Sequence, residues 1–168
     1  ILAFFLRMII LLLINNNYEE SVIMNETNEL LEYFHKTADM GAKSTEYLLG
    51  FLKNKENKIK KALEDQYKEY LKFQKEIDKI LKKKKLELKE AGVMANVMSY
   101  MGIKMEVLKD NSDAKMADML TQGLTMGVLE VRKKLKALSK EADEDVVKLG
   151  KDFLKFQEDS IEKLKTFL

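Results

Sequence analysis

Carboxylates are the main groups of this sequence that could form a metal site, because nitrogen and sulfur ligands are nearly absent. The chain has 168 residues, with one histidine (His35) and no cysteine. A His-rich or Cys-ligated metal site within one subunit is therefore excluded. His35 alone is typical of a surface residue, and a ligand role is the alternative. The candidate ligands for a divalent cation are Glu46, Glu69, Asp118 and Glu130, and their spacing does not show that they converge.

Four methionines follow one another at helical spacing in the second half of the chain. Thioethers pack well in irregular apolar gaps, so this face predicts a short helix packed on the rest of the protein. An exposed partner-binding face is the alternative. Thioethers also bind Cu(I), but no cysteine or histidine accompanies them, so we expect neither copper nor another cofactor. The four residues are Met94, Met98, Met101 and Met105.

The composition narrows the fold and function classes. The sequence has no proline and 35% charged residues, as expected for long uninterrupted helices. Its 30 basic and 28 acidic residues leave a net charge of +2, so we expect no nucleic-acid partner. No serine, threonine or lysine lies in a recognisable catalytic motif, and Gly-rich phosphate loops are absent. We therefore expect a protein that is not an enzyme.

Apolar residues recur at three- and four-residue steps in four segments, which predicts four helices. The clearest segment has one stripe from Leu120 to Leu138 and a second stripe that includes Gly123, so we expect neighbours on both sides of it. Gly123 and Gly127 lie one turn apart, which indicates either close packing or local flexibility for binding. The predicted helices span residues 25–52, 57–90, 112–139 and 143–168.

The first residues differ from the rest of the chain. Residues 1–14, ILAFFLRMIILLLI, are almost wholly apolar but shorter than the roughly 20 residues that span a bilayer. Glu-Glu-Ser, just before Met24, can be encoded by a purine-rich run of the kind that binds ribosomes. We therefore expect the native domain to comprise residues 24–168, with 1–23 as an apolar extension. A short membrane anchor is the alternative if residues 1–14 are genuine.

The lengths of the links predict the helix order. Short links join the first helix to the second and the third to the fourth, so each pair is expected to form an antiparallel hairpin. Residues 91–111 could run the length of the bundle, with a crossover helix at about 93–108. We predict an all-α antiparallel four-helix bundle with up-down-down-up order, and up-down-up-down is the alternative.

In the up-down-down-up order, four polar residues fall at one height of the bundle. Buried amides need partners, so we expect these side chains to bond one another or a water molecule. The layer would then either fix the helix register or be a remnant or variant of a ligand site. Its members are Thr45, Gln66, Gln122 and Gln157.

The helix order, the long link and stretches such as LKFQKEI and MGIKMEVL resemble ferritin-like bundles, in particular small bacterial domains of unknown function. The resemblance covers about residues 25–168. Di-iron members carry Glu on two helices and Glu-x-x-His on the other two. Here Lys72 follows Glu69 and Ile161 follows Glu158 at that spacing, so no position takes over a metal-ligand role.

These observations predict a cytoplasmic, non-enzymatic bundle that acts by association with a protein partner or with a second copy of itself. The methionine face and the glycine pair favour this function. The alternatives are a carboxylate-based divalent-metal binding protein and a membrane-associated helical protein.

Overall fold

The computed structural model describes the backbone of residues 2–88 and 109–168, and the side chains of these ranges from Asn15 onward. Within those ranges it has four helices and no strand. The prediction of an all-α helical bundle is confirmed. The predicted crossover helix and its methionines lie outside the described residues. The helices are α1 (Leu2–Phe51), α2 (Lys60–Lys84), α4 (Asp113–Leu138) and α5 (Glu144–Lys165).

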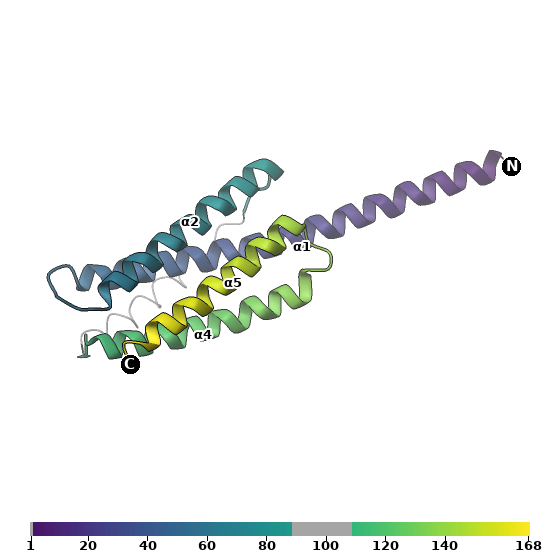
Figure 1. Ribbon diagram of the computed structural model, residues 1–168. Helices are drawn as coiled ribbons and strands as arrows, with labels where there is room; N and C mark the ends of the chain where they lie inside the picture. Colours follow the sequence, from purple (N-terminus) through teal and green to yellow (C-terminus); the bar gives the residue numbers. More distant parts are fainter. Residues whose placement is uncertain (1, 89–108) are drawn as a thin grey trace.

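Two helical hairpins, α1–α2 and α4–α5, pack against each other along their length (Figure 1). At one end, the Asn57 amide just before α2 donates to the Asp113 carboxylate at the start of α4, with an N–O distance of 2.8 Å. At the other end, the backbone N–H of Asp143 donates to the Thr27 hydroxyl of α1 at 2.9 Å. The end of α2 lies there as well, since Lys84 forms an ion pair with Asp143. The starts of α2 and α4 therefore share one end of the bundle.

Local signals explain where the helices begin and end. The Ser112 hydroxyl caps α4 by accepting a hydrogen bond from the backbone N–H of Lys115 at 3.2 Å. Lys85, which follows α2, has a left-handed φ of 54°, and the N–H of Leu86 then bonds the Leu81 carbonyl at 3.0 Å. Lysines in the last turn of α2 complement the helix dipole.

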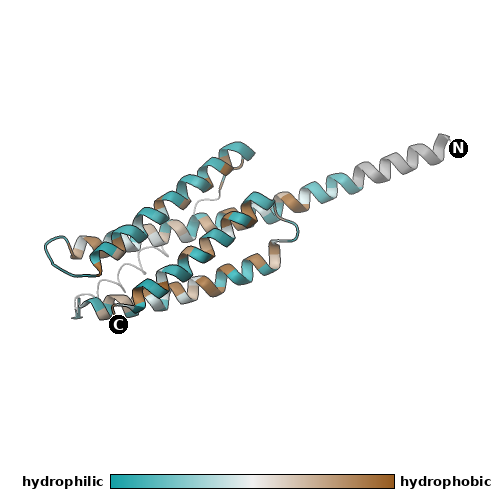
Figure 2. Ribbon diagram, in the orientation of Figure 1, coloured by the Kyte–Doolittle hydropathy of each residue, from teal (hydrophilic) through white to brown (hydrophobic). Residues whose placement is uncertain are grey.

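The bundle core falls into two clusters of buried residues. One contains the aromatic rings of Phe34, Tyr70, Phe73 and Phe153, and we call it the aromatic half. The other, the aliphatic half, surrounds the link between α1 and α2. Figure 2 shows the hydrophobic residues recurring along the helices between hydrophilic runs. The buried members of the aliphatic half are Leu48, Leu52, Ile59, Ala62, Leu63, Met116, Ala117, Leu124 and Leu164.

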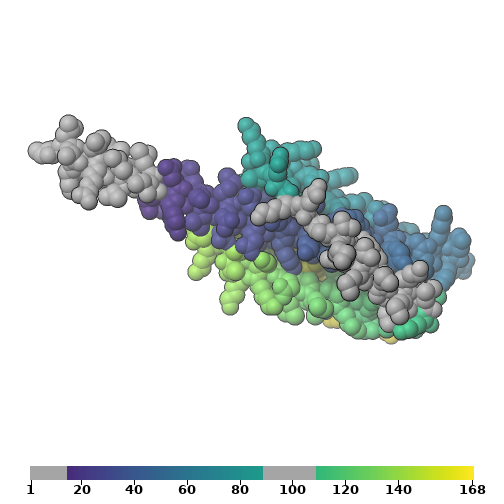
Figure 3. Space-filling view, turned by 180° about the vertical axis from the view of Figure 1, so that it is seen from behind, coloured from purple at the N-terminus to yellow at the C-terminus, as the bar shows by residue number. Residues whose placement is uncertain are grey.

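α1 is longer than predicted. It is one continuous helix from Leu2, whereas the sequence predicted a start near residue 25. No proline or glycine precedes Gly41, so nothing in the local sequence interrupts the helix. Its first part extends beyond the other helices (Figure 1), and the stretch that begins at Asn15 still protrudes in Figure 3. Tyr18 and Met24 are exposed. Among the described residues, none of the helices combines the length and apolarity needed to cross a membrane.

Candidate functional site

Three of the four predicted polar-layer residues lie together. Thr45, Gln66 and Gln157 come from α1, α2 and α5 and have exposed fractions of 1%, 6% and 2%. They line one cavity of about 430 Å³ that also borders α4. The structure therefore brings together side chains that are far apart in the sequence.

Gln122 does not belong to this layer, and that prediction was wrong. Its side chain is exposed, and its amide donates to the Asp118 carboxylate one turn earlier at 3.0 Å. The physical reason is the rotation of α4, which turns Leu124 and Val128 into the core instead. The described residues therefore cover only part of the second apolar stripe of α4, since Gly123 and Met126 are exposed.

The expected hydrogen bonds among the polar-layer residues do not form. The Thr45 hydroxyl donates to the Gly41 carbonyl of its own helix at 2.7 Å. Gln66 interacts with the fully buried hydroxyl of Tyr70. Burial raises the pKa of Tyr70 to about 12, and the hydrogen bond with Gln66 opposes this rise. The Gln157 Oε1 atom has no hydrogen-bond partner within the described part of the chain.

The walls of this cavity are mainly apolar. α1 and α4 supply most of them, and the glycine pair of α4 lies on the α4 side. A Cβ atom at Gly127 would lie 3.0 Å from the Gln157 Nε2 atom, so Gly127 leaves room for that amide. A Cβ atom at Gly123 would meet nothing within 4 Å. The close-packing interpretation therefore fails for Gly123 and holds for Gly127.

The candidate metal ligands do not converge. Glu69 pairs with Lys72, and Glu130 pairs with Lys133, with N–O distances of 3.5 and 2.6 Å. No group of three or more Asp, Glu or His side chains suited to a metal ion occurs in the ranges that the structure describes.

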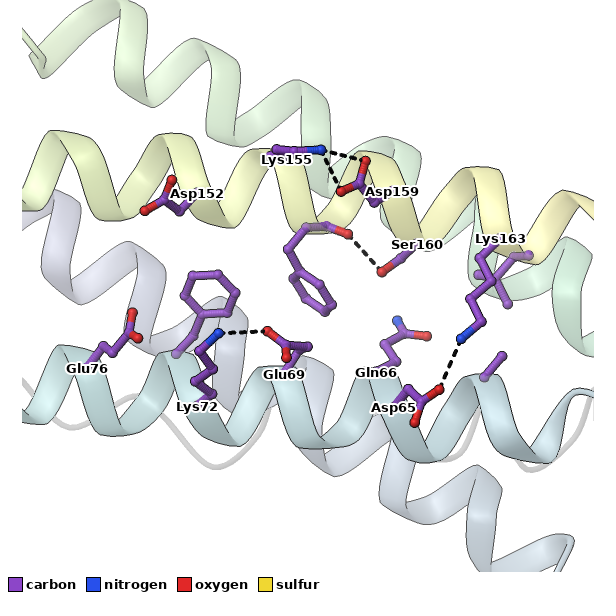
Figure 4. Close-up of a pocket in the computed structure, with 14 residues that line it drawn as sticks. Asp65, Gln66, Glu69, Lys72, Glu76, Asp152, Lys155, Asp159, Ser160 and Lys163 are labelled. Carbon is purple, nitrogen blue, oxygen red and sulfur yellow. Dashed lines mark hydrogen bonds and ion pairs between the residues drawn. The ribbon is translucent and has the colours of Figure 1, made fainter.

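A second groove, of about 470 Å³, runs between α2 and α5 and carries charges on both rims (Figure 4). Its lysines are paired: Lys163 with Asp65 at 3.1 Å and Lys155 with Asp159 at 2.7 Å. Hydrogen bonds from Lys61 and Lys163 lower the pKa of Asp65 to about 2. Of these pairs, Lys163–Asp65 joins α5 to α2, while Lys155–Asp159 lies within α5.

The outward face of α4 carries an exposed apolar pair. Met126 is 71% exposed and Leu129 is 52% exposed, one turn apart. Asp118 lies towards the start of α4 and the exposed Lys136 lies in its last turn. Within the described ranges Lys136 forms no ion pair, whereas the neighbouring Lys133 does. This face combines apolar residues at its centre with opposite charges at its ends.

Comparison with known proteins found no matching protein-family model, no matching curated protein and no matching solved structure.

Proposed function

We propose that this chain is a non-enzymatic, ferritin-like bundle of up-down-down-up order that acts in the cytoplasm by association with a second copy of itself. The hydrogen bond between Asn57 and Asp113 supports the helix order, because it joins the starts of α2 and α4. The observation that carries the association is the outward face of α4, with Met126 and Leu129 exposed at its centre.

The charges of this face suit an antiparallel pair of α4 helices. Asp118 and Lys136 are eighteen residues apart, which is five turns of 3.6 residues, so they lie on one line along the helix. A twofold axis at the height of Gly127, midway between them, would set each Asp118 opposite Lys136 of the second copy. An interface of this kind is self-complementary.

The apolar pair would supply most of the affinity. At the same twofold axis, Met126 of one copy would lie beside Leu129 of the other. Burying a methionine or leucine side chain contributes about 1.5–3 kcal/mol. Exposed ion pairs contribute about 0–1 kcal/mol, so the charges would mainly fix the antiparallel orientation.

Sedimentation equilibrium over a range of concentrations tests the proposal. We expect a concentration-dependent dimer, with Met126→Glu or Leu129→Glu raising its dissociation constant at least tenfold. Leu168→Glu is the matched control, because Leu168 is also exposed, at 64%, but follows α5 and lies outside α4. A monomer at all concentrations, or a dimer unchanged by both α4 substitutions, would overturn the proposal.

A charge exchange tests the orientation. Lys136→Asp alone should weaken the dimer by placing two carboxylates together. The addition of Asp118→Lys should restore it, because the pair then has opposite charges again. A double variant that dimerises as weakly as Lys136→Asp alone would contradict the antiparallel arrangement.

A further inference from the structure

The groove between α2 and α5 is separate from the outward face of α4. Residues of α2 and α5 line it, and α4, which carries Met126 and Leu129, contributes none of the lining. On α2 the lining extends from Ala62 to Glu76, which is about 21 Å along the helix at a rise of about 1.5 Å per residue. The groove is therefore about as long as a helix of four turns.

The lining of this groove includes residues at the spacing of a coiled-coil seam. On both helices these positions alternate between four- and three-residue steps. Such a repeat, every 3.5 residues, keeps one face of a helix turned towards a packed partner helix. Both walls of the groove therefore have the periodicity that suits a third helix laid between them. The positions are Ala62, Gln66, Glu69, Phe73 and Glu76 on α2, and Asp152, Phe156, Asp159 and Lys163 on α5.

Aromatic side chains form the middle of the groove. The Phe73 and Phe156 rings both line it, and their centroids are 5.5 Å apart. Phe73 is buried, whereas Phe156 is only partly buried and remains accessible. The nearby Ser160 hydroxyl donates to the Phe156 carbonyl of its own helix at 2.8 Å, so its proton is already used. The middle of the groove therefore favours an apolar side chain of a partner.

The rims carry more carboxylates than the lysines of the lining neutralise. Each of the three lysines that line the groove forms an ion pair with a carboxylate of the lining. Among the described residues, Glu76 and Asp152 have no ion-pair partner. Figure 4 shows these two residues on opposite rims at the same end of the groove. Carboxylates beside aromatic rings favour a cation with an apolar stem, which is the form of arginine and lysine side chains.

We propose that this groove docks an amphipathic helix of a protein partner, with its apolar stripe over the Phe73 and Phe156 rings. An arginine or lysine of this helix lies between Glu76 and Asp152. An acidic helix is disfavoured, because it would bring like charges to these carboxylates. The proposal goes beyond the association of two copies through α4, since no residue of the groove belongs to α4.

Two synthetic helical peptides test the proposal by isothermal titration calorimetry on the full chain. Both have sixteen residues, with leucines at three- and four-residue steps. The first carries two arginines at one end, and the second carries citrulline there, which has nearly the same shape without the charge. We expect the arginine peptide to bind about tenfold more tightly, which corresponds to about 1.4 kcal/mol. Equal affinities, tighter binding of the citrulline peptide, or binding of neither would overturn the proposal.

Removal of the two unpaired carboxylates assigns the preference to the groove. Glu76→Gln combined with Asp152→Asn should bind both peptides equally. Asp78→Asn combined with Glu162→Gln is the matched control, because it removes two exposed carboxylates of the same helices that do not line the groove. The control should keep the tenfold preference. A preference that persists in the first double variant, or that is lost in the control, would overturn the proposal.

Nuclear magnetic resonance of the unmodified protein locates the bound peptide. In a ¹⁵N-labelled sample, the backbone amides of Phe73 and Phe156 should shift on addition of the arginine peptide, whereas those of Met126 and Leu129 should not. Sedimentation equilibrium should give the same oligomeric state with and without the peptide. Unchanged Phe73 and Phe156 resonances at saturation would overturn the proposal. Dissociation of a dimer by the peptide would also overturn it, because a second copy would then be the occupant of the groove.

Discussion

The two halves of the core are built from different side chains around one polar layer. In the aromatic half, the Phe73 and Phe153 rings lie edge to face with centroids 4.9 Å apart, and Tyr70 meets Phe156 at 5.0 Å and 90°. The aliphatic half consists mainly of leucine, isoleucine, methionine and alanine. Along α2 the change occurs at Gln66, which follows Leu63 and precedes Tyr70.

Glycines show what this difference does to packing. A Cβ atom at Gly41 would overlap the Tyr70 ring, and one at Gly150 would overlap the Phe34 ring. Large rings of fixed shape thus need glycine backbone beside them. Gly123 of α4, next to the aliphatic half, faces open space instead. The aromatic half is closely packed at Gly41 and Gly150, and the cavity of about 430 Å³ is bordered by both halves, by Tyr70 on one side and Leu48 on the other.

The largest expected loss of stability comes from a substitution in the aromatic half. In Gly150→Ala the new methyl group overlaps the Phe34 ring and lies 2.8 Å from Leu135 Cδ2. Overpacking costs about 1–3 kcal/mol, so the urea midpoint should fall clearly. Gly123→Ala is the matched control and should raise stability by up to about 1 kcal/mol, because alanine is the better residue within a helix. Shifts of the same sign in both variants would contradict the comparison.

An intermediate effect is expected at the polar layer between the halves. Gln157→Leu removes an unpartnered acceptor and should stabilise the protein by about 1 kcal/mol in urea unfolding. Gln66→Leu should destabilise it by a similar amount, because the buried Tyr70 hydroxyl loses its interaction with Gln66. Destabilisation by Gln157→Leu would show that the amide has a partner in solution.

The smallest expected effect concerns the charge pairs over the α2–α5 groove. The pKa of Asp65 is lowered to about 2 by Lys61 and Lys163, below its value in the unfolded chain. Its stabilising effect is therefore present above about pH 4 and is lost as the pH falls towards 2. Asp65→Asn should lower the melting temperature slightly at pH 6 and make no difference near pH 2. Asp78→Asn, an exposed carboxylate of the same helix, is the control, and an equal pH dependence in both variants would contradict the prediction.

The sequence predicted the helices better than their rotation. Apolar spacing identified α2, α4 and α5 to within a few residues, except that α2 ends at Lys84 and not near residue 90. Spacing also placed Thr45, Gln66 and Gln157 in the core, because each interrupts an apolar stripe. It failed for Gln122, because one residue along a helix turns a side chain by about 100° and the count from the helix end did not fix that angle.

The sequence by itself determined that this chain forms long helices with buried stripes, because proline is absent and apolar residues repeat every three to four positions. Only the tertiary structure decided which polar residues meet. The Gln157 Oε1 atom is buried without a hydrogen-bond partner among the described residues, because the side chains that pack around it offer it no donor. Of the candidate carboxylates, Glu69 and Glu130 pair with lysines on their own helices, where local spacing favours the ion pair over a shared metal.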